Sequence, residues 1–221
     1  MKIICALALA ILTSLGSGLV SADEPAFGDS GHVAISVERL FGYAHQWLSE
    51  DLGPTTSKVS SNTFSFLGGG AAAPYSSPRV GGDIFVARNF SIGFAGIVLH
   101  RSSTLTAPQG QSLDQSITLY QLAPRVGYTL RVSSRLTLWL RAGLAYDHNS
   151  TNSGAVTSTT SLTAVTVETP LVVPLAARAA LLVAPFAEFG IDGSIAISSM
   201  PAAINTTATV IGVQLGLLVF L

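Results

Sequence analysis

The chain has 221 residues, of which 10% are charged and 48% are hydrophobic, and its mean hydropathy is +0.53. Eleven basic and twelve acidic side chains give a net charge of −1, which excludes the basic face that a nucleic-acid-binding protein turns toward phosphates. Disorder is excluded as well, because disordered chains combine low hydrophobicity with high net charge. Soluble domains carry about 25% charged residues. The composition therefore predicts a protein whose outer surface faces lipid.

Residues 1–22 have the features of a secretory signal peptide. Lys2 gives a positive start, residues 3–12 form a short apolar core, and small residues precede the cleavage point. We expect the exported domain to comprise residues 23–221. The only cysteine, Cys5, is removed with the signal peptide. We therefore expect neither a disulfide nor thiol chemistry in the exported protein.

The sequence after the signal peptide lacks a convincing membrane-spanning helix. Its best candidate, residues 171–189, contains Pro174, Arg178, Pro185 and Glu188, and prolines and charges at such places disfavour a spanning helix. Lipid offers no water to backbone N–H and C=O groups, so the other spanning structure is a closed barrel whose strands satisfy one another. We expect an all-β transmembrane barrel.

Period-two alternation supports the barrel, because barrel strands turn every second residue toward lipid and the others toward the lumen. Over residues 209–221 the odd positions are mainly aliphatic, whereas glycines and a glutamine occupy even positions. The segments 120–130 and 136–147 alternate in the same way and carry Arg125 and Arg141 on their polar faces. These three segments indicate strands with one face in lipid.

Eight such segments fit an antiparallel up-and-down barrel. We expect the strands near residues 32–45, 78–88, 90–103, 115–130, 135–148, 161–175, 180–193 and 206–221. Long connections rich in Ser, Thr and Gly alternate with short ones, as extracellular loops alternate with periplasmic turns in outer-membrane barrels. An even number of strands places both termini on the periplasmic side.

Aromatic side chains should form a belt at each membrane interface, because their amphipathic rings favour headgroup depth. Tyr120 and Tyr128 share one face and lie about 26 Å apart along a strand. A strand tilt of about 40° converts this distance to roughly the height of the apolar band. The expected belt residues are Tyr43, Trp47, Tyr120 and Tyr146 at the extracellular side, and Phe90, Tyr128 and Phe220 at the periplasmic side.

Together, the signal peptide, the alternating segments and the apolar terminal strand resemble the small bacterial outer-membrane β-barrel family, like the transmembrane domain of outer membrane protein A. The segments GHVAISVERLFGYAH and PRVGGDIFVARNFSIGFAG are similar to barrel proteins predicted in deltaproteobacteria such as myxobacteria. The resemblance covers residues 31–221 and implies recognition of the terminal strand by the barrel-assembly machinery. The family usually ends in Phe, whereas here Phe220 is penultimate and Leu221 ends the chain.

Six charged side chains fall on expected lumen faces: Glu38, Asp83, Arg125, Arg141, Glu168 and Glu188. An eight-stranded barrel is just wide enough to be filled by side chains, and an unpaired charge is costly at low dielectric. We therefore predict a network of ion pairs that closes the lumen, in preference to a proton or ion path. Strict alternation turns Arg39 toward lipid, unless a β-bulge or an interfacial position redirects it.

The four histidines, His32, His45, His100 and His148, have no metal-ligand spacing. Three of them are expected at the extracellular rim, where a metal site or a catalytic dyad with Asp147 would require them to converge. We prefer the interpretation of solvated strand ends. Residues 68–70, a run of three glycines, do not link a strand to a helix and are expected to be a loop hinge rather than a phosphate site.

The sequence thus predicts a monomeric bacterial outer-membrane barrel with a structural or adhesive role and long extracellular loops. We expect no enzymatic activity, no cofactor, no metal and no nucleic-acid partner, and we expect contacts with outer-membrane lipid and lipopolysaccharide. The alternative is a narrow channel or a transporter of small hydrophobic ligands. A third hypothesis, a barrel enzyme that hydrolyses lipid or peptide, requires the rim histidines to meet a nucleophile.

Overall fold

A computed structural model describes residues 27–66, 77–106, 112–133, 136–154 and 156–221. The predicted signal peptide and the glycine run at residues 68–70 lie outside the described residues. No helix among the described residues is long and apolar enough to cross a membrane. The elements are β1 (Val33–Asp51), β2 (Thr56–Phe66), β3 (Arg79–Ala87), β4 (Phe90–Thr106), β5 (Ser112–Ser133), β6 (Leu136–Ser153), β7 (Val156–Glu168), β8 (Leu171–Ala176), β9 (Ala179–Ile197) and β10 (Ile204–Phe220).

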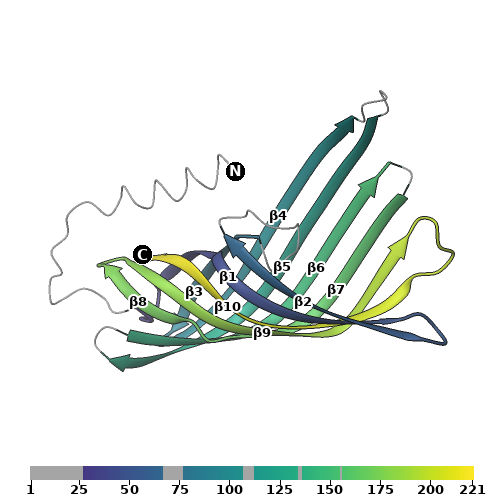
Figure 1. The fold of residues 1–221 in the computed structure, drawn as a ribbon. Coiled ribbons are helices and arrows are strands. Elements are labelled where there is room, and N and C mark those ends of the chain that lie inside the picture. Colours follow the sequence, from purple (N-terminus) through teal and green to yellow (C-terminus); the bar gives the residue numbers. More distant parts are fainter. Residues whose placement is uncertain (1–26, 67–76, 107–111, 134–135, 155) are drawn as a thin grey trace.

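The strands form one antiparallel sheet that closes on itself (Figure 1). Its spatial order runs β10–β1–β3–β4–β5–β6–β7–β9, and pairing of β9 with β10 completes the ring. Over the part of the ring that includes β3, closure satisfies backbone groups that an open sheet would leave at its edges. The predicted all-β, up-and-down antiparallel architecture is confirmed.

The structure has ten strands among the described residues where eight were expected. The additional strand β2 lies in the expected loop after the first strand and pairs with β1; its threonines, valine and phenylalanines favour extended backbone. The expected strand 161–175 is divided at Thr169 and Pro170 into β7 and β8. Beyond that break, β8 takes over the pairing with β6 and β9.

Several strands are longer than expected. β5 has 22 residues, about twice the roughly 10 residues that a tilted strand needs to cross a bilayer. The extra length lies at the end of the barrel where Ser- and Thr-rich connections were expected to form loops. Figure 1 shows the hairpins β4–β5 and β6–β7 projecting there. We call this the projecting end, and the opposite end, where the β3–β4 and β8–β9 turns lie, the short-turn end.

The two faces of the ring alternate as predicted. In β5, the side chains of Gln121, Arg125 and Thr129 are buried, whereas Leu122, Val126 and Leu130 are exposed. In β10, Gln214 and Leu218 point inward, and Ile211 and Val213 are exposed. Polar groups therefore gather inside the ring and aliphatic groups cover its outside.

An apolar cluster fills the short-turn end of the lumen. Its members are Ala34, Phe85, Trp139, Val172, Ala180, Leu182, Leu218 and Phe220, with Phe27 packed against them. The ring of Phe27 makes edge-to-face contacts with Phe85, Trp139 and Phe220 at centroid distances of 5.2–5.4 Å. Gly28, with a φ of 104°, turns the chain into this position; a Cβ there would lie 2.6 Å from the Thr129 hydroxyl.

The placement of Phe220 corrects the expectation that it belongs to the outer aromatic belt. It is 8% exposed and lies inside the lumen. Phe220 shares its even position with Gln214 and Leu218, so the alternation that places those residues inside also places Phe220 there.

Candidate functional site

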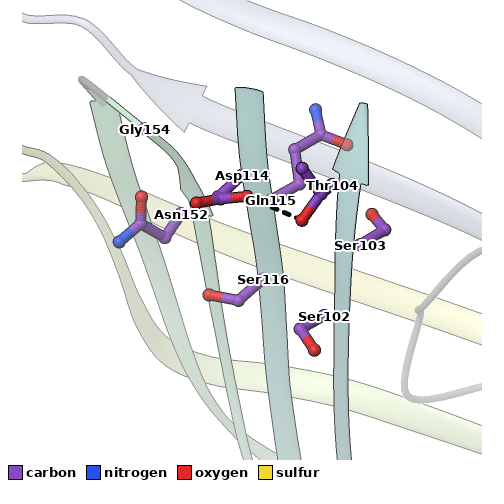
Figure 2. A pocket seen from close by; sticks show the side chains of 8 residues that line it. All are labelled: Ser102, Ser103, Thr104, Asp114, Gln115, Ser116, Asn152 and Gly154. Carbon is purple, nitrogen blue, oxygen red and sulfur yellow. Dashed lines mark hydrogen bonds between the residues drawn. The ribbon is translucent and has the colours of Figure 1, made fainter. Parts of the chain in front are cut away.

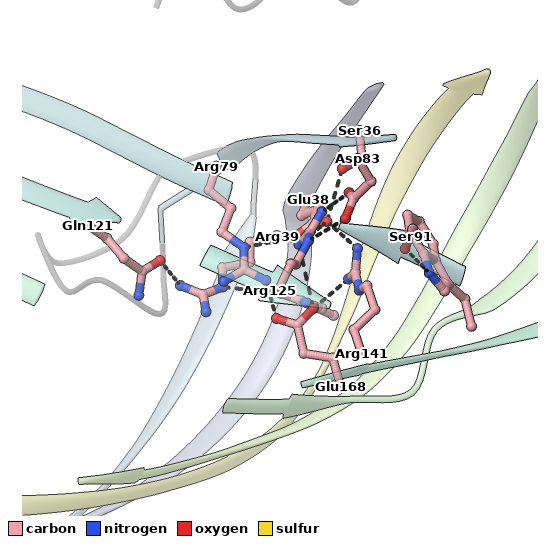
Figure 3. Close-up of polar contacts among 12 residues, drawn as sticks. Ser36, Glu38, Arg39, Arg79, Asp83, Ser91, Gln121, Arg125, Arg141 and Glu168 are labelled. Carbon is pink, nitrogen blue, oxygen red and sulfur yellow. Dashed lines mark hydrogen bonds and ion pairs between the residues drawn. The ribbon is translucent and has the colours of Figure 1, made fainter. Parts of the chain in front are cut away.

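A dense network of ion pairs lies in the lumen beside the apolar cluster (Figure 3). Its centre is Glu38 of β1, whose carboxylate contacts the guanidinium groups of three arginines: Arg79 at 2.7 Å, Arg125 at 2.9 Å and Arg141 at 2.7 Å. Glu38 is 2% exposed. One buried anion thus holds together strands β1, β3, β5 and β6.

Two further carboxylates complete this network. Arg125 binds Asp83 through two hydrogen bonds of 3.1 and 2.6 Å, the bidentate geometry that makes such pairs strong. Glu168 of β7 pairs with Arg79 and with Arg141, the second contact at 2.5 Å. The structure therefore brings together five of the six lumen charges singled out in the sequence.

The sixth, Glu188, belongs to a second group built around Arg39. Arg39 is fully buried and contacts Glu188 at 2.6 Å. It also donates 3.1 Å hydrogen bonds to the side-chain oxygens of Gln214 and Gln121. Its guanidinium lies 5.5 Å from the centre of the Phe186 ring, within cation–π range.

A β-bulge turns Arg39 inward, which corrects the lipid-facing position that strict alternation gives it. The β1–β10 register shifts between Val37 and Phe41, and Arg39 has a φ of 61°, unusual for a residue with a side chain. The facing residue on β10 is Gly216, where a Cβ would lie 2.6 Å from the Val37 carbonyl oxygen. Glycine at this position leaves room for the bulge.

The sequence interpretation missed three residues of the lumen. Arg79 and Trp139 are buried and have the same alternation phase as Asp83 and Arg141, respectively, so period-two counting could have found both. Arg39 could not be assigned in this way, because a bulge reverses the phase. The Trp139 ring lies 4.7 Å from the Arg141 guanidinium and joins the ion pairs to the apolar cluster.

The rim histidines face outward and make separate local contacts. A ring nitrogen of His45 lies 2.7 Å from the Asn62 side-chain oxygen, and His100 and His148 contact Thr118 and Ser161 at 2.9 and 3.1 Å. Asp147, by contrast, is buried in the lumen, and the side chains of consecutive strand residues point to opposite faces. A dyad between Asp147 and His148 is therefore absent from the described part of the chain.

Within the described residues, no group of three or more His, Cys, Asp or Glu side chains could hold a metal ion.

Six of the seven expected belt residues are exposed, with exposed fractions from 37% to 47%: Tyr43, Trp47, Phe90, Tyr120, Tyr128 and Tyr146. Tyr120 stacks on His148 with ring centroids 4.6 Å apart.

A polar pocket of about 430 Å³ lies where the hairpins β4–β5 and β6–β7 project (Figure 2). Hydroxyl, amide and carboxylate groups line it, and Thr104 donates a 2.7 Å hydrogen bond to Asp114. The other lining residues are Ser102, Ser103, Gln115, Ser116, Asn152 and Gly154. These groups can exchange hydrogen bonds with a neutral polar ligand at the tip of the molecule.

No protein-family model and no curated protein matches this sequence. Among solved structures, the chain is similar to Ail, the attachment invasion locus protein of Yersinia pestis, with 13% identity and a TM-score of 0.41 over 87% of this chain and 99% of that chain. It is also similar to Neisserial surface protein A, with 16% identity and a TM-score of 0.47 over 86% of this chain and 97% of that chain. A third similar structure is that of the outer membrane protein OprG from Pseudomonas aeruginosa, with 10% identity and a TM-score of 0.48 over 88% of this chain and 98% of that chain.

Proposed function

We propose that this protein is a closed β-barrel of a bacterial outer membrane with a structural or adhesive role. The observation that carries this proposal is the filled lumen, in which the Glu38 network and the apolar cluster follow one another along the barrel axis. A barrel of this size has room for side chains or for a passage, but not for both.

The outer surface supports the membrane location. Exposed aliphatic and aromatic side chains cover the ring, among them Ile35, Ile84, Ile92, Phe94 and Val126. Such a surface is unfavourable in water and matches the lipid-facing band of a transmembrane barrel. The four lumen arginines, Arg39, Arg79, Arg125 and Arg141, each have a carboxylate partner and are buried inside the ring, away from this outer surface.

The projecting hairpins support the adhesive role. They extend the sheet beyond the length needed to span a bilayer, and they carry Ser, Thr, Asn and Gln on their exposed faces. The polar pocket at Asp114 and Asn152 offers these groups to the outside (Figure 2). A rigid β-sheet presents them with less loss of conformational entropy on binding than a mobile loop would.

The closed lumen predicts the absence of steady ion conductance. Purified protein inserted in planar lipid bilayers is expected to leave the current at the level of the protein-free membrane, because the buried side chains of the Glu38 network and the Trp139 cluster occupy the lumen. Insertion is checked independently by heat-modifiable migration on gels. A steady wild-type conductance that disappears in Glu168→Gln or Arg141→Ala would contradict the proposal.

One observation favours the alternative of a small hydrophobic-ligand transporter. Among the described residues, β2 pairs with β1 alone, and β4 beyond Gly96 pairs with β5 alone. Within the residues that the structure describes, no ladder pairing therefore joins β2 to the outer half of β4. Leu119 and Leu162, both buried in the lumen, would give a ligand entering there an apolar surface.

For this alternative, the expected result is faster uptake of a lipophilic fluorescent dye by cells that carry the protein. A Leu119→Lys variant should lose the effect, because binding of the dye beside the lysine would require the ammonium group to be desolvated. Exposed Leu113 is 43% accessible and provides the matched control, Leu113→Lys. Equal uptake with and without the protein would exclude this function.

A further inference from the structure

The outer face of the projecting hairpins carries an ordered array of polar side chains. Within the apolar band, outward-facing residues of β4, β5 and β6 have even numbers, as exposed Phe94, Leu122 and Tyr146 show. Beyond that band the same positions become polar, and strand pairing sets them side by side across β4, β5, β6 and β7. We call eight of them the polar platform: His100, Thr118, Ser150 and Thr159 in a lower row, nearer the band, and Ser102, Ser116, Asn152 and Thr157 in an upper row.

The platform contains no acidic side chain, no lysine and no arginine. Six of its eight members carry hydroxyl groups, and a hydroxyl group both donates and accepts hydrogen bonds. On one face, side chains repeat about every 6.8 Å along a strand, and neighbouring strands lie about 4.8 Å apart. Arg101 lies between His100 and Ser102 in the sequence, so alternation turns it to the opposite face. The platform therefore matches a neutral ligand that is itself rich in hydroxyl groups.

The polar pocket described above gives this array depth. Ser102, Ser116 and Asn152 of the upper row line it, together with Thr104 and Asp114, which pair with each other one row further out. Figure 2 shows these side chains gathered around the pocket. The Asp114 carboxylate accepts a hydrogen bond from Thr104 and is the one charged group of the lining. A carboxylate accepts hydrogen bonds from ligand hydroxyl groups and repels phosphate.

The position of the platform identifies the layer of the membrane that it faces. Tyr120 and Tyr146 lie on the same outer face below the lower row, with ring centroids 6.0 Å apart, and tyrosines at such places mark headgroup depth. The platform begins two residues beyond Tyr120 on β5, and the pocket extends to Asp114. For a strand tilted by about 40°, these positions lie roughly 5–15 Å above the headgroups. Because the platform faces sideways, its neighbours are molecules of the same leaflet.

We propose that the polar platform and its pocket bind the neutral sugars of lipopolysaccharide in the surrounding outer leaflet. The inference rests on the membrane location proposed above and specifies which part of lipopolysaccharide the protein recognises. Sugar hydroxyl groups would exchange hydrogen bonds with the Ser, Thr and Asn side chains. At the foot of the platform, the stacked rings of Tyr120 and His148, 4.6 Å apart, offer an apolar surface to sugar C–H groups. Lipid phosphates would instead require arginine or lysine partners, which the platform does not contain.

The test compares two lipopolysaccharides that share the lipid A phosphates and acyl chains. One carries a complete, unphosphorylated outer core, and the other ends at the inner acidic sugars. The chain without its predicted signal peptide is folded in phosphatidylcholine vesicles that contain increasing mole fractions of either molecule. We expect the complete core, at about ten times its half-saturating mole fraction, to raise the Tm by roughly 3–6 °C above the value with the truncated molecule.

Paired substitutions of threonine by valine separate the platform from the rest of the hairpins. Thr118→Val with Thr159→Val removes two hydroxyl groups of the lower row and keeps a β-branched side chain at each position. Each lost hydrogen bond should weaken binding by about two- to tenfold, so this variant should need a correspondingly higher mole fraction of complete core for the same rise in Tm. The matched control, Thr151→Val with Thr160→Val, makes the same exchange on the opposite face of the hairpins and should respond as the wild type does.

Asn152→Ala is a second test variant, because Asn152 is exposed at the end of β6 and its loss leaves no cavity in the lumen. It removes the amide group from the pocket and should also need more complete core than the control variant does.

Three results would overturn the sugar site. An equal rise in Tm with the complete and the truncated molecule would assign binding to the phosphates or acyl chains. An equal response of the lower-row variant, Asn152→Ala and the control variant would show that the platform is not the site. A rise in Tm with soluble dextran, in vesicles free of lipopolysaccharide and without a response to the complete core, would assign the platform to glycans of another surface.

Heat-modifiable migration on gels checks the barrel independently of the sugar site. A chain that shows this migration in phosphatidylcholine vesicles and responds to neither lipopolysaccharide would refute the sugar site and leave the proposed membrane barrel in place. A chain that does not fold in any of the vesicles would contradict both proposals.

Discussion

Replacing Glu38 with alanine is expected to destabilise the folded barrel by about 3–5 kcal/mol, the loss typical of a buried ion pair that keeps only one partner. The Glu38 carboxylate contacts Arg79, Arg125 and Arg141, so its removal leaves three buried guanidinium groups short of negative charge. The measurement is the free energy of unfolding from urea titrations in lipid vesicles, followed by circular dichroism.

Glu50→Ala provides the matched control, because Glu50 lies on the same strand and outside the network. Its substitution should change the free energy of unfolding by less than about 1 kcal/mol. A double variant, Glu38→Leu with Arg79→Leu, removes one charge of each sign and should lose less stability than the sum of its single variants. Equal losses in Glu38→Ala and Glu50→Ala would show that the network adds nothing to stability.

Replacing Trp139 with alanine should cost about 3–5 kcal/mol, as large-to-small substitutions of buried aromatics do. Trp139 is fully buried, packs against Phe27 and Phe85 and donates a 3.2 Å hydrogen bond to Ser91. The resulting cavity would lie between the apolar cluster and the Arg141 guanidinium. Guanidinium chloride titrations in lipid vesicles measure the loss.

The chain's other tryptophan, Trp47, provides a control for the loss of stability expected in Trp139→Ala. Trp47 is 47% exposed on the outer face, so Trp47→Ala removes a ring of equal size without leaving a cavity in the lumen. We expect its effect on the free energy of unfolding to be below about 1.5 kcal/mol. A loss for Trp47→Ala as large as for Trp139→Ala would contradict the assignment of Trp139 to the core.

Period-two alternation was sufficient to predict the inner and outer faces of the ring. Gln121, Arg125 and Arg141 are buried, and Tyr120 and Tyr128 are exposed, because a regular strand fixes the direction of every side chain relative to its neighbours. The same rule would have placed Phe220 and Trp139 inside, had it been applied without regard to the tendency of aromatics to lie at interfaces.

The sequence could not reveal features that depend on pairing between distant residues. The bulge at Arg39 becomes visible only beside Gly216 of β10, and β2 is a strand because it pairs with β1. Composition indicates a loop for both the β2 segment and the projecting hairpins, since Ser, Thr and Asn are common in turns. Whether such residues form strands is decided by tertiary context.

The ion-pair network has a consequence for how the chain assembles. Its partners are far apart in sequence, 103 residues for Glu38 and Arg141 and 149 residues for Arg39 and Glu188, and contacts of high sequence separation form slowly. An unclosed sheet inserted in a bilayer would present these guanidinium and carboxylate groups to hydrocarbon, at a cost of several kcal/mol for each. We therefore expect closure of the first strand onto the last to precede or accompany insertion, so that the charged groups are already paired when the sheet meets hydrocarbon.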